Sequence, residues 1–344
     1  MKKNINTKGR IIRFCFALVC LVLAWWWHSW LALGVALFTF YEAAASWCVY
    51  YHLIGKNECP LASNAGTTTN LLNASKAKGN PTMSFAQVNG QKLYYEIHGE
   101  GHPLVLINGF SSDSTLWKPI LETLAKQYQV LIFDNRNVGR SSDLTSTFTT
   151  DDMAEDAMGL VDILQLKRPH ILGHSLGGGI AQTIAYKYPQ KVDKLILCCT
   201  TQKFNTRSLM TMDFTRYLLE NKVPFDKVVD SILPWFYSNA FLGNSAALQM
   251  VKHFLLNNPH PQSLNGFKCQ MHALANFDST SWVDKITAPT LIVSGGEDLL
   301  CLNEQHELKR KITQATLVHF PEVGHSPFIE QPEKFLKTVL TFLH

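Results

Sequence analysis

Apolar residues are concentrated at the start of the chain, in a run from Ile11 to Ile54. A helix crosses the hydrocarbon core of a bilayer in about 20 residues, so this run is long enough for two helices. Tryptophans gather midway, at Trp25–Trp30, and indole rings favour the membrane–water boundary where a turn would lie. The pattern therefore predicts a transmembrane helical hairpin over residues 1–60. Its main polar interruptions are Arg13, His28, Ser29, Glu42 and His52.

The charges that flank the run predict its orientation. Basic residues precede it, Lys56 follows it, and the predicted turn carries neither Lys nor Arg, so the positive-inside rule places both ends in the cytoplasm. A single tilted span is the alternative and would place the rest of the chain outside. A cleaved signal peptide is a third reading, but its apolar core is usually far shorter. The basic cluster before the first predicted helix is Lys2, Lys3, Lys8, Arg10 and Arg13.

After residue 60 the pattern changes twice. Residues 61–82 are rich in Ser, Asn, Thr, Gly, Ala and Lys without an apolar period, which is typical of a linker. Residues 83–344 alternate short β-rich runs with helical stretches, which predicts an α/β domain with a mostly parallel sheet. The predicted strands are Ser84–Val88, Gln91–His98, Leu104–Asn108, Val130–Asp134, His170–His174, Leu195–Thr200, Thr290–Ser294 and Thr316–Phe320, with helices at Asp151–Leu166, Gly178–Tyr188 and Glu304–Ile312.

One interval breaks the alternation. From about residue 201 to 285 there is no convincing buried strand, but amphipathic segments recur at Met212–Asn221, Phe225–Phe236 and Ala246–Asn257. This predicts a helical lid inserted after the sixth of eight strands.

Composition excludes several function classes. The chain has 344 residues and a formal charge of +4 with no long Lys/Arg run beyond its N-terminus, so nucleic acid is not an expected partner. Its eight cysteines form no C-x-x-C pair and have no zinc-ligand spacing, so neither a disulfide framework nor a metal site is expected. No organic cofactor is expected.

The clearest chemical motif is Gly173-His174-Ser175-Leu176-Gly177, a G-x-S-x-G sequence between a predicted strand and a predicted helix. In this motif the serine sits on a sharp turn that exposes its hydroxyl, and the glycines avoid clashes on either side. Ser175 is therefore the candidate nucleophile, and the N–H of Leu176 is a candidate donor to an oxyanion.

A serine hydroxyl needs a base, a carboxylate that orients the base, and a second oxyanion donor. His325 is the candidate base because it lies in the loop after the last strand. The N–H of Phe110, in the loop after the third strand, is the candidate second donor. Asp298 and Glu297, which end the preceding strand, are both candidates for the acid.

These motifs resemble the α/β-hydrolase superfamily over nearly all of residues 84–344. The resemblance implies the α/β-hydrolase fold, and its Gly-x-x-Asp pattern favours Asp298 over Glu297 as the acid. Asn108 replaces the His of the family's usual His-Gly pair, and Asn137 replaces a Gly in Asp134–Ser141, which we interpret as a structural turn. A serine at position 175 argues against dehalogenase or epoxide hydrolase chemistry.

The lid carries weaker information. The C-terminal part of the lid, Phe267–Leu274, resembles the same part of hydrolases similar to 3-oxoadipate enol-lactonase and of general carboxylesterases. Apolar lid residues are candidates for an acyl pocket, although plain packing of the lid core is the better explanation for any one of them. These candidates are Leu218, Leu219, Leu233, Trp235, Phe236, Phe241 and Met250.

Residues 1–60 resemble the two-helix membrane module found alone or fused to bacterial rhodaneses, through Cys48, Gly55 and Cys59 and their neighbours. The resemblance implies a bacterial inner-membrane location. Cys48-Val49 replaces the family's usual Cys-Pro, and small apolar filling at a helix end is favoured over a redox role for Cys48 and Cys59. Membrane hairpins can pair through small residues such as Gly34 and Ala43–Ala45, so the oligomeric state stays open.

The sequence thus predicts a membrane-anchored serine hydrolase that cleaves a small-molecule carboxylic ester, lactone or thioester. Its catalytic residues would be Ser175, Asp298 and His325. The alternative is a non-catalytic, membrane-anchored binding module on a hydrolase scaffold.

Overall fold

The computed structural model describes Ala17 and residues 82–344 of the chain. The chain divides into two compact units, Met1–Lys76 and Ala77–His344. The predicted membrane hairpin and nearly all of the predicted linker lie outside the described residues. Among the helices of the described part, none combines the length and the apolar character that a membrane span requires.

An eight-stranded sheet forms the centre of the second unit, in the order β1-β2-β4-β3-β5-β6-β7-β8. The hairpin of β1 and β2 pairs antiparallel, β2 pairs antiparallel with β4, and all later neighbours are parallel. This confirms the predicted α/β class and the number of strands. The strands are β1 (Thr82–Val88), β2 (Gln91–His98), β3 (His102–Ile107), β4 (Tyr128–Phe133), β5 (His170–His174), β6 (Leu195–Cys198), β7 (Thr290–Gly295) and β8 (Thr316–Phe320).

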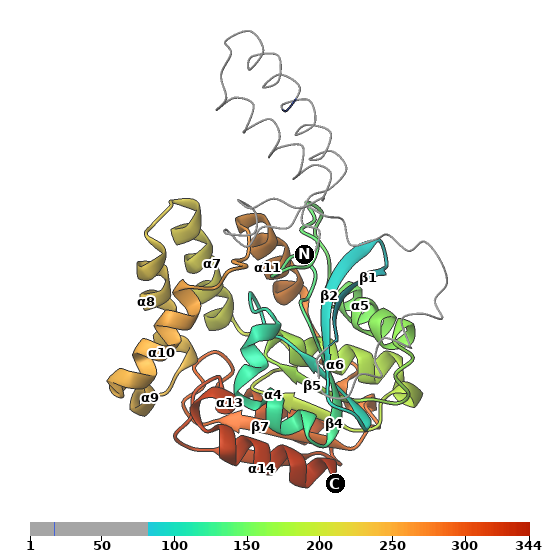
Figure 1. Ribbon diagram of the computed structural model, residues 1–344. Helices are drawn as coiled ribbons and strands as arrows, with labels where there is room; N and C mark the ends of the chain where they lie inside the picture. The colour runs from blue at the N-terminus through green and yellow to red at the C-terminus, as the bar shows by residue number, and fades with distance from the viewer. Residues whose placement is uncertain (1–16, 18–81) are drawn as a thin grey trace. The chain divides into compact units, whose positions relative to one another are not determined.

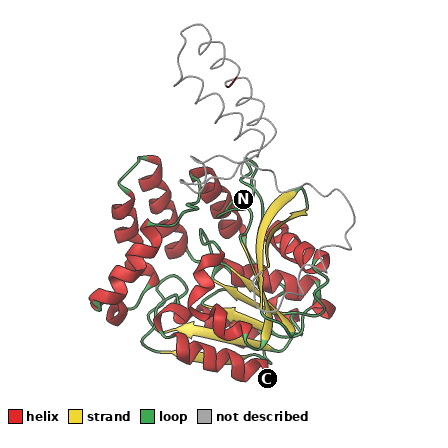
Figure 2. Ribbon diagram, in the orientation of Figure 1, coloured by secondary structure: helices red, strands yellow, loops and turns green. Residues whose placement is uncertain are grey.

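Helices cover both faces of this sheet (Figures 1 and 2). Successive strand residues point to opposite faces, so each central strand contributes to two cores. On β5, for example, Ile171 packs in the core with α5 and α6, whereas Leu172 packs in the core with α4 and α14. These helices are α4 (Lys118–Ala125), α5 (Thr150–Ile163), α6 (Leu176–Lys187), α12 (Glu304–Lys311), α13 (Pro327–Glu330) and α14 (Pro332–Leu343), with 3₁₀ turns η2 (Ser114–Trp117), η3 (Pro189–Lys191) and η4 (Val283–Lys285).

Five helices follow β6 before the chain returns to the sheet at β7, where a helical lid was predicted. Figure 1 shows α7, α8, α9 and α10 gathered on one side of the molecule. Val229, Leu233, Tyr237 and Val251 form a small core within this lid. The lid helices are α7 (Thr206–Glu220), α8 (Phe225–Phe236), α9 (Asn239–Gly243), α10 (Ser245–Leu256) and α11 (Leu264–Asn276).

Strand β6 is shorter than predicted. It ends at Cys198 because Cys199 adopts φ 46°, a left-handed conformation that cannot continue a strand. The chain therefore turns away from the sheet two residues before the predicted end at Thr200.

Candidate active site

Ser175 lies in a strained turn between β5 and α6. Its φ of 54° and ψ of −120° lie outside the regions that residues with a side chain ordinarily occupy. The serine is the N-cap residue of α6, and its carbonyl oxygen accepts hydrogen bonds from the N–H groups of Gly178 and Gly179. The turn thus presents the Ser175 side chain at the carboxyl edge of the parallel strands.

The two motif glycines are required by close approach of the backbone. A Cβ on Gly173 would lie 2.2 Å from the carbonyl oxygen of Gly177, and a Cβ on Gly177 would lie 2.2 Å from that of Ile107. Both distances are far below van der Waals contact. Side chains at either position would therefore push α6 away from β5 and β3.

His325 and Asp298 are both fully buried and in direct contact. The Nδ1 of His325 lies 2.9 Å from Oδ1 of Asp298. That oxygen also accepts from the backbone N–H groups of Leu300 and Cys301, and Gln305 donates to Oδ2. Because a buried carboxylate is costly unless its oxygens are hydrogen-bonded, these donors explain how Asp298 is accommodated.

The rival carboxylate lies elsewhere. Glu297 accepts a hydrogen bond from the backbone N–H of Asn239, in the lid, at 2.7 Å. Of the two acidic residues at the end of β7, Asp298 is therefore the one that contacts His325.

The Nε2 of His325 is buried and has no hydrogen-bond partner among the described residues. Its backbone N–H donates to the carbonyl oxygen of Phe236, at the end of lid helix α8, which ties the lid to the histidine loop. With Nδ1 held by Asp298, Nε2 is the ring nitrogen left to exchange a proton.

His174 is close to the site but has a different role. Its Nε2 contacts the carbonyl oxygen of His325 at 2.8 Å, so it supports the backbone of the histidine loop. Burial, reinforced by His325, lowers the pKa of His174 to about 3. This histidine therefore stays neutral across the physiological range.

The two backbone N–H groups expected to bind an oxyanion are those of Phe110 and Leu176. Neither Phe110 nor Leu176 donates its N–H to any acceptor within residues 82–344. Leu176 is the first residue of α6, where the helix dipole adds a partial positive charge. Phe110 and Ser175 both line the same small cavity.

The loop that carries Phe110 is braced from two directions. Asn108 donates from its amide to the carbonyl oxygen of Phe133, at the end of β4. Gln270, which is fully buried in lid helix α11, accepts from the N–H of Ser111 and donates to the carbonyl oxygen of Arg136. Asn108 thus fixes the loop through its side chain, although it replaces the family's usual histidine.

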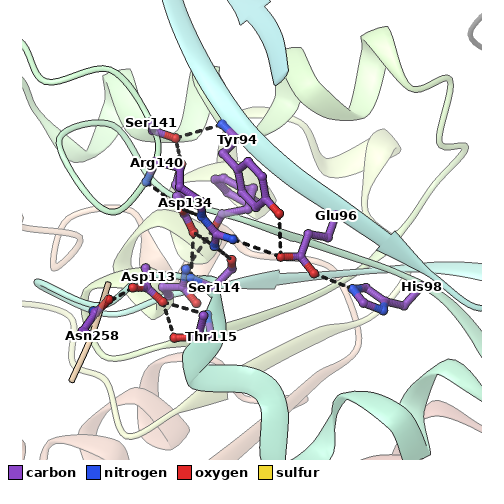
Figure 3. A network of polar contacts seen from close by, with 12 residues as sticks. Tyr94, Glu96, His98, Asp113, Ser114, Thr115, Asp134, Arg140, Ser141 and Asn258 are labelled. Carbon is purple, nitrogen blue, oxygen red and sulfur yellow. Dashed lines mark hydrogen bonds and ion pairs between the residues drawn. The ribbon is translucent and has the colours of Figure 1, made fainter. Parts of the chain in front are cut away.

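A polar network continues this bracing (Figure 3). Asp134 accepts from the N–H of Ser114 at 2.8 Å and from Nε of Arg140 at 2.7 Å. Arg140 also contacts Glu96 and stacks over the ring of Tyr94. Burial lowers the pKa of Arg140, but the hydrogen bond to Asp134 and the charges of Asp134, Tyr94 and Glu96 together raise it above the ordinary value. The segment from Asp134 to Ser141 is thus a hydrogen-bonded turn, as predicted.

The cavity in front of Ser175 is small and largely apolar. Its volume is about 20 Å³, roughly the room for one water. Of the lid residues proposed from the sequence for an acyl pocket, only Phe236 lines it; Leu233 packs inside the lid, and Met250 is 56% exposed. The apolar side chains that do line it are Phe110, Phe204, Met212, Phe236, Leu274 and Leu300.

Several supporting residues were not identified from the sequence. Gln270 and Gln305 carry no motif, because an isolated glutamine has no characteristic neighbours. Cys199 lies with Asp298 and His325 in a group whose potential ligand atoms are all within 4.8 Å of one another. Burial raises the pKa of the Cys199 thiol well above its usual value, so it is a neutral group beside the acid.

Comparison with known families matches two parts of the chain. Residues 102–332 match the family described as alpha/beta hydrolase fold. Residues 1–62 match the family described as inner membrane protein YgaP-like, transmembrane domain. Both resemblances inferred from the sequence are confirmed by these matches.

Individual relatives and solved structures agree with the first match. A putative carbamate hydrolase, RutD, of Caulobacter sp. (strain K31) is 29% identical over 269 residues, covering 76% of this chain and 98% of the relative. The enol-lactonase of Burkholderia xenovorans LB400 superposes with a TM-score of 0.67 at 25% identity, covering 76% and 99% of the two chains. A thermophilic esterase of Thermogutta terrifontis superposes with a TM-score of 0.67 at 26% identity, covering 76% and 98%.

Proposed function

The chain belongs to the α/β hydrolase fold family, and we propose that it is a serine hydrolase that cleaves a carboxylic ester, lactone or thioester through an acyl-enzyme. The observation that carries the proposal is the 2.9 Å contact between buried Asp298 and buried His325. These residues follow β7 and β8, at the strand edge where Ser175 follows β5. Ligands of open α/β sheets bind at this carboxyl edge.

In the proposed reaction each residue of the site has a separate role. Ser175 Oγ attacks the carbonyl carbon while its proton passes to Nε2 of His325, and the carbonyl oxygen becomes an oxyanion held by the N–H groups of Phe110 and Leu176. His325 then protonates the leaving alcohol, and an acyl-serine ester remains. Water, deprotonated by the same nitrogen, releases the acid. Asp298 holds the Nδ1 proton and stabilises the imidazolium.

The cavity favours an uncharged acyl group. No Lys, Arg, Asp or Glu is among the cavity residues that the structure describes. A charged group would be desolvated there without a partner, which is costly. The small volume favours short acyl groups, or requires that the lid move before a longer chain enters.

Carbamates form a second substrate class, because the chain is 29% identical to putative carbamate hydrolases. The same triad and oxyanion donors would serve a carbamate carbonyl, with an amine or alcohol as the leaving group. The apolar cavity favours esters over the more polar carbamates.

Membrane anchoring is part of the proposal. It is supported by the match of residues 1–62 to an inner-membrane transmembrane domain. Following the positive-inside rule, the hydrolase unit would face the cytoplasm. After cell lysis, the full chain should sediment with membranes and be released by detergent but not by high salt. Release by salt alone would contradict anchoring.

The enzymatic proposal is tested with p-nitrophenyl esters from acetyl to palmitoyl and a matched aryl carbamate, using detergent-purified full chain. Ser175→Ala should lower kcat by roughly 10⁴-fold or more, because no other hydroxyl replaces the nucleophile. Ser231→Ala, which removes a hydroxyl of α8 that lies outside the cavity in front of Ser175 and donates to the carbonyl oxygen of Val228, is the matched control and should retain most activity. Equal activity of wild type and Ser175→Ala would refute the proposal.

The competing interpretation is a binding module without catalysis. Labelling by a fluorophosphonate probe separates the two, since only an activated serine reacts with it. Labelling that disappears in Ser175→Ala supports the enzyme. An unlabelled, correctly folded wild type that hydrolyses nothing would favour the binding module.

A further inference from the structure

A group of metal-ligating side chains lies at the opposite edge of the sheet. His102 begins β3, His170 begins β5, and Asp193 lies two residues before β6. These strands are adjacent and parallel, so their beginnings meet at one edge. The proposed active site lies at the other edge, where the same strands end.

The ligand atoms of this group converge. Nε2 of His102 lies 3.6 Å from Oδ2 of Asp193, and Nδ1 of His170 lies 3.4 Å from the same oxygen. All three atoms lie within 4.8 Å of one another. Zinc ligands at about 2.0–2.1 Å in a tetrahedron are separated by roughly 3.3–3.4 Å, so two of the three separations already approach those of a zinc site.

An independent observation also indicates a ligand. His170 is 96% buried, with a relative exposure of 4%, yet its Nδ1 has no hydrogen-bond partner among the described residues. A buried polar atom without a partner is costly, and in native proteins such an atom usually has a partner or a role. This nitrogen lies 3.4 Å from Oδ2 of Asp193 without forming a hydrogen bond to it, so its lone pair is available to a metal ion.

The surroundings hold the carboxylate in place for a ligand. Arg168 binds Oδ1 of Asp193 at 3.1 Å, which leaves Oδ2 available. The backbone N–H of Asp193 donates to the carbonyl oxygen of Pro169, which fixes the loop beside His170. The side chains of His102 and Asp193 are 40% and 30% exposed, so an ion can enter from solvent and keep a water ligand.

We propose that His102, His170 and Asp193 form a binding site for Zn²⁺ or a similar divalent transition metal ion, which cross-links the starts of β3 and β5 to the loop before β6. Two imidazole nitrogens and one carboxylate oxygen suit zinc better than Ca²⁺ or Mg²⁺, which prefer all-oxygen ligands. The sequence did not predict this site, because its ligands come from three separate segments without a spacing pattern. The site lies away from Ser175 and so stabilises the fold without entering the hydrolysis.

Zinc titration of the full chain tests the site. The detergent-purified protein is treated with EDTA, kept under a thiol-free reductant, and titrated with Zn²⁺ against a chromophoric chelator. Wild type should bind one more equivalent of Zn²⁺ than His102→Ala or Asp193→Asn does. If the variants still bind that equivalent, their affinity for Zn²⁺ should be at least tenfold lower. Zn²⁺ should also raise the melting temperature of wild type more than that of either variant.

The control is His306→Ala, which removes another exposed histidine that lies beside a second histidine ring, His319. It should bind zinc as wild type does. Both ligand variants change partly exposed side chains, and equal metal-free melting temperatures would establish that they fold. Equal zinc affinity and stoichiometry in all four proteins would overturn the proposal, whatever substrate the enzyme cleaves.

Discussion

The proposed chemistry depends on polar side chains that are buried and yet paired. Asp298 has no exposed surface, and backbone N–H groups and the imidazole of His325 satisfy Oδ1. Burial strengthens such contacts, since less water competes for the charge. Replacing one carboxylate oxygen of Asp298 by an NH₂ group should therefore lower the reaction rate strongly.

Asp298→Asn is expected to lower kcat by about 10³–10⁴-fold with little change in KM. An amide cannot stabilise the imidazolium, and its NH₂ group favours the wrong tautomer of His325. The control is Glu297→Gln, because Glu297 bonds to Asn239 in the lid. Steady-state kinetics on a p-nitrophenyl ester would distinguish them. If Glu297→Gln lost most of its kcat while Asp298→Asn kept a normal kcat, Glu297 and not Asp298 would be the acid of the triad.

His174 should make stability depend on pH. Its pKa in the folded chain is about 3, against an ordinary value of 6.5, because burial disfavours the charged ring. As pH falls below about 6.5 the unfolded chain takes up a proton that the folded chain refuses. The free energy of unfolding should therefore fall by about 1.4 kcal/mol per pH unit from this residue, between about pH 6 and pH 4.

Urea unfolding of wild type and His174→Gln at pH 7, 6 and 5 measures this effect by tryptophan fluorescence. The glutamine variant keeps a donor for the carbonyl oxygen of His325 but cannot titrate. It should be less stable at pH 7 and show a flatter pH dependence. Parallel pH profiles for the two proteins would contradict the assignment.

At the scale of elements, the lid is hydrogen-bonded to the site at two points. At the end of helix α8, the carbonyl oxygen of Phe236 accepts a hydrogen bond from the N–H of His325. In α11, the side-chain oxygen of Gln270 accepts a hydrogen bond from the N–H of Ser111. The lid therefore supports both the base and the oxyanion loop, in addition to covering the cavity. Lid movement that admits substrate must preserve or re-form these contacts.

Gln270→Leu should lower kcat by about 10–100-fold, because it frees the loop that carries Phe110. It leaves the N–H of Ser111 and the carbonyl oxygen of Arg136 without partners, at a cost of about 1–3 kcal/mol each. The control is Gln262→Leu, since Gln262 bonds to Asn137 and not to this loop. The prediction is checked by measuring kcat of each variant at a temperature below its melting temperature, where the protein is folded. Similar kcat values for both variants would mean that Gln270 acts only on stability.

Sequence periodicity predicted many of the elements whose buried faces are apolar, although it did not predict α4, whose buried residues Ile120, Leu121 and Leu124 are all apolar. All eight strands and helix α8 were located, and β2, β5, β8 and α8 have the predicted bounds. Helix α7 begins six residues before the predicted Met212, because its buried face includes polar Ser208 and Thr211. Helix α11 was not assigned, because Gly266 and Gln270 lie on its buried face. A helix that buries polar or small residues lacks the apolar periodicity from which a helix is predicted.

At the scale of the whole molecule, motif and topology give different kinds of information. Ser175, Asp298 and His325 could be named because each lies in a recognisable local sequence after a strand. The group of His102, His170 and Asp193 could not, because only the order of strands in the folded sheet brings them together. Local sequence can predict a site built from motifs, whereas contacts between distant segments require the folded structure.

The division of the chain into two units predicts that residues 77–344 fold and act alone. The described residues of the two main cores all lie at or beyond Val88, within the second unit, which favours its independent folding. The shortened chain should remain soluble without detergent and hydrolyse a short p-nitrophenyl ester with a kcat/KM within about threefold of the full chain. A comparison of both proteins in the same detergent isolates the effect of the deletion. If the shortened chain folds but loses activity, the N-terminal unit must contribute to substrate binding as well as to location.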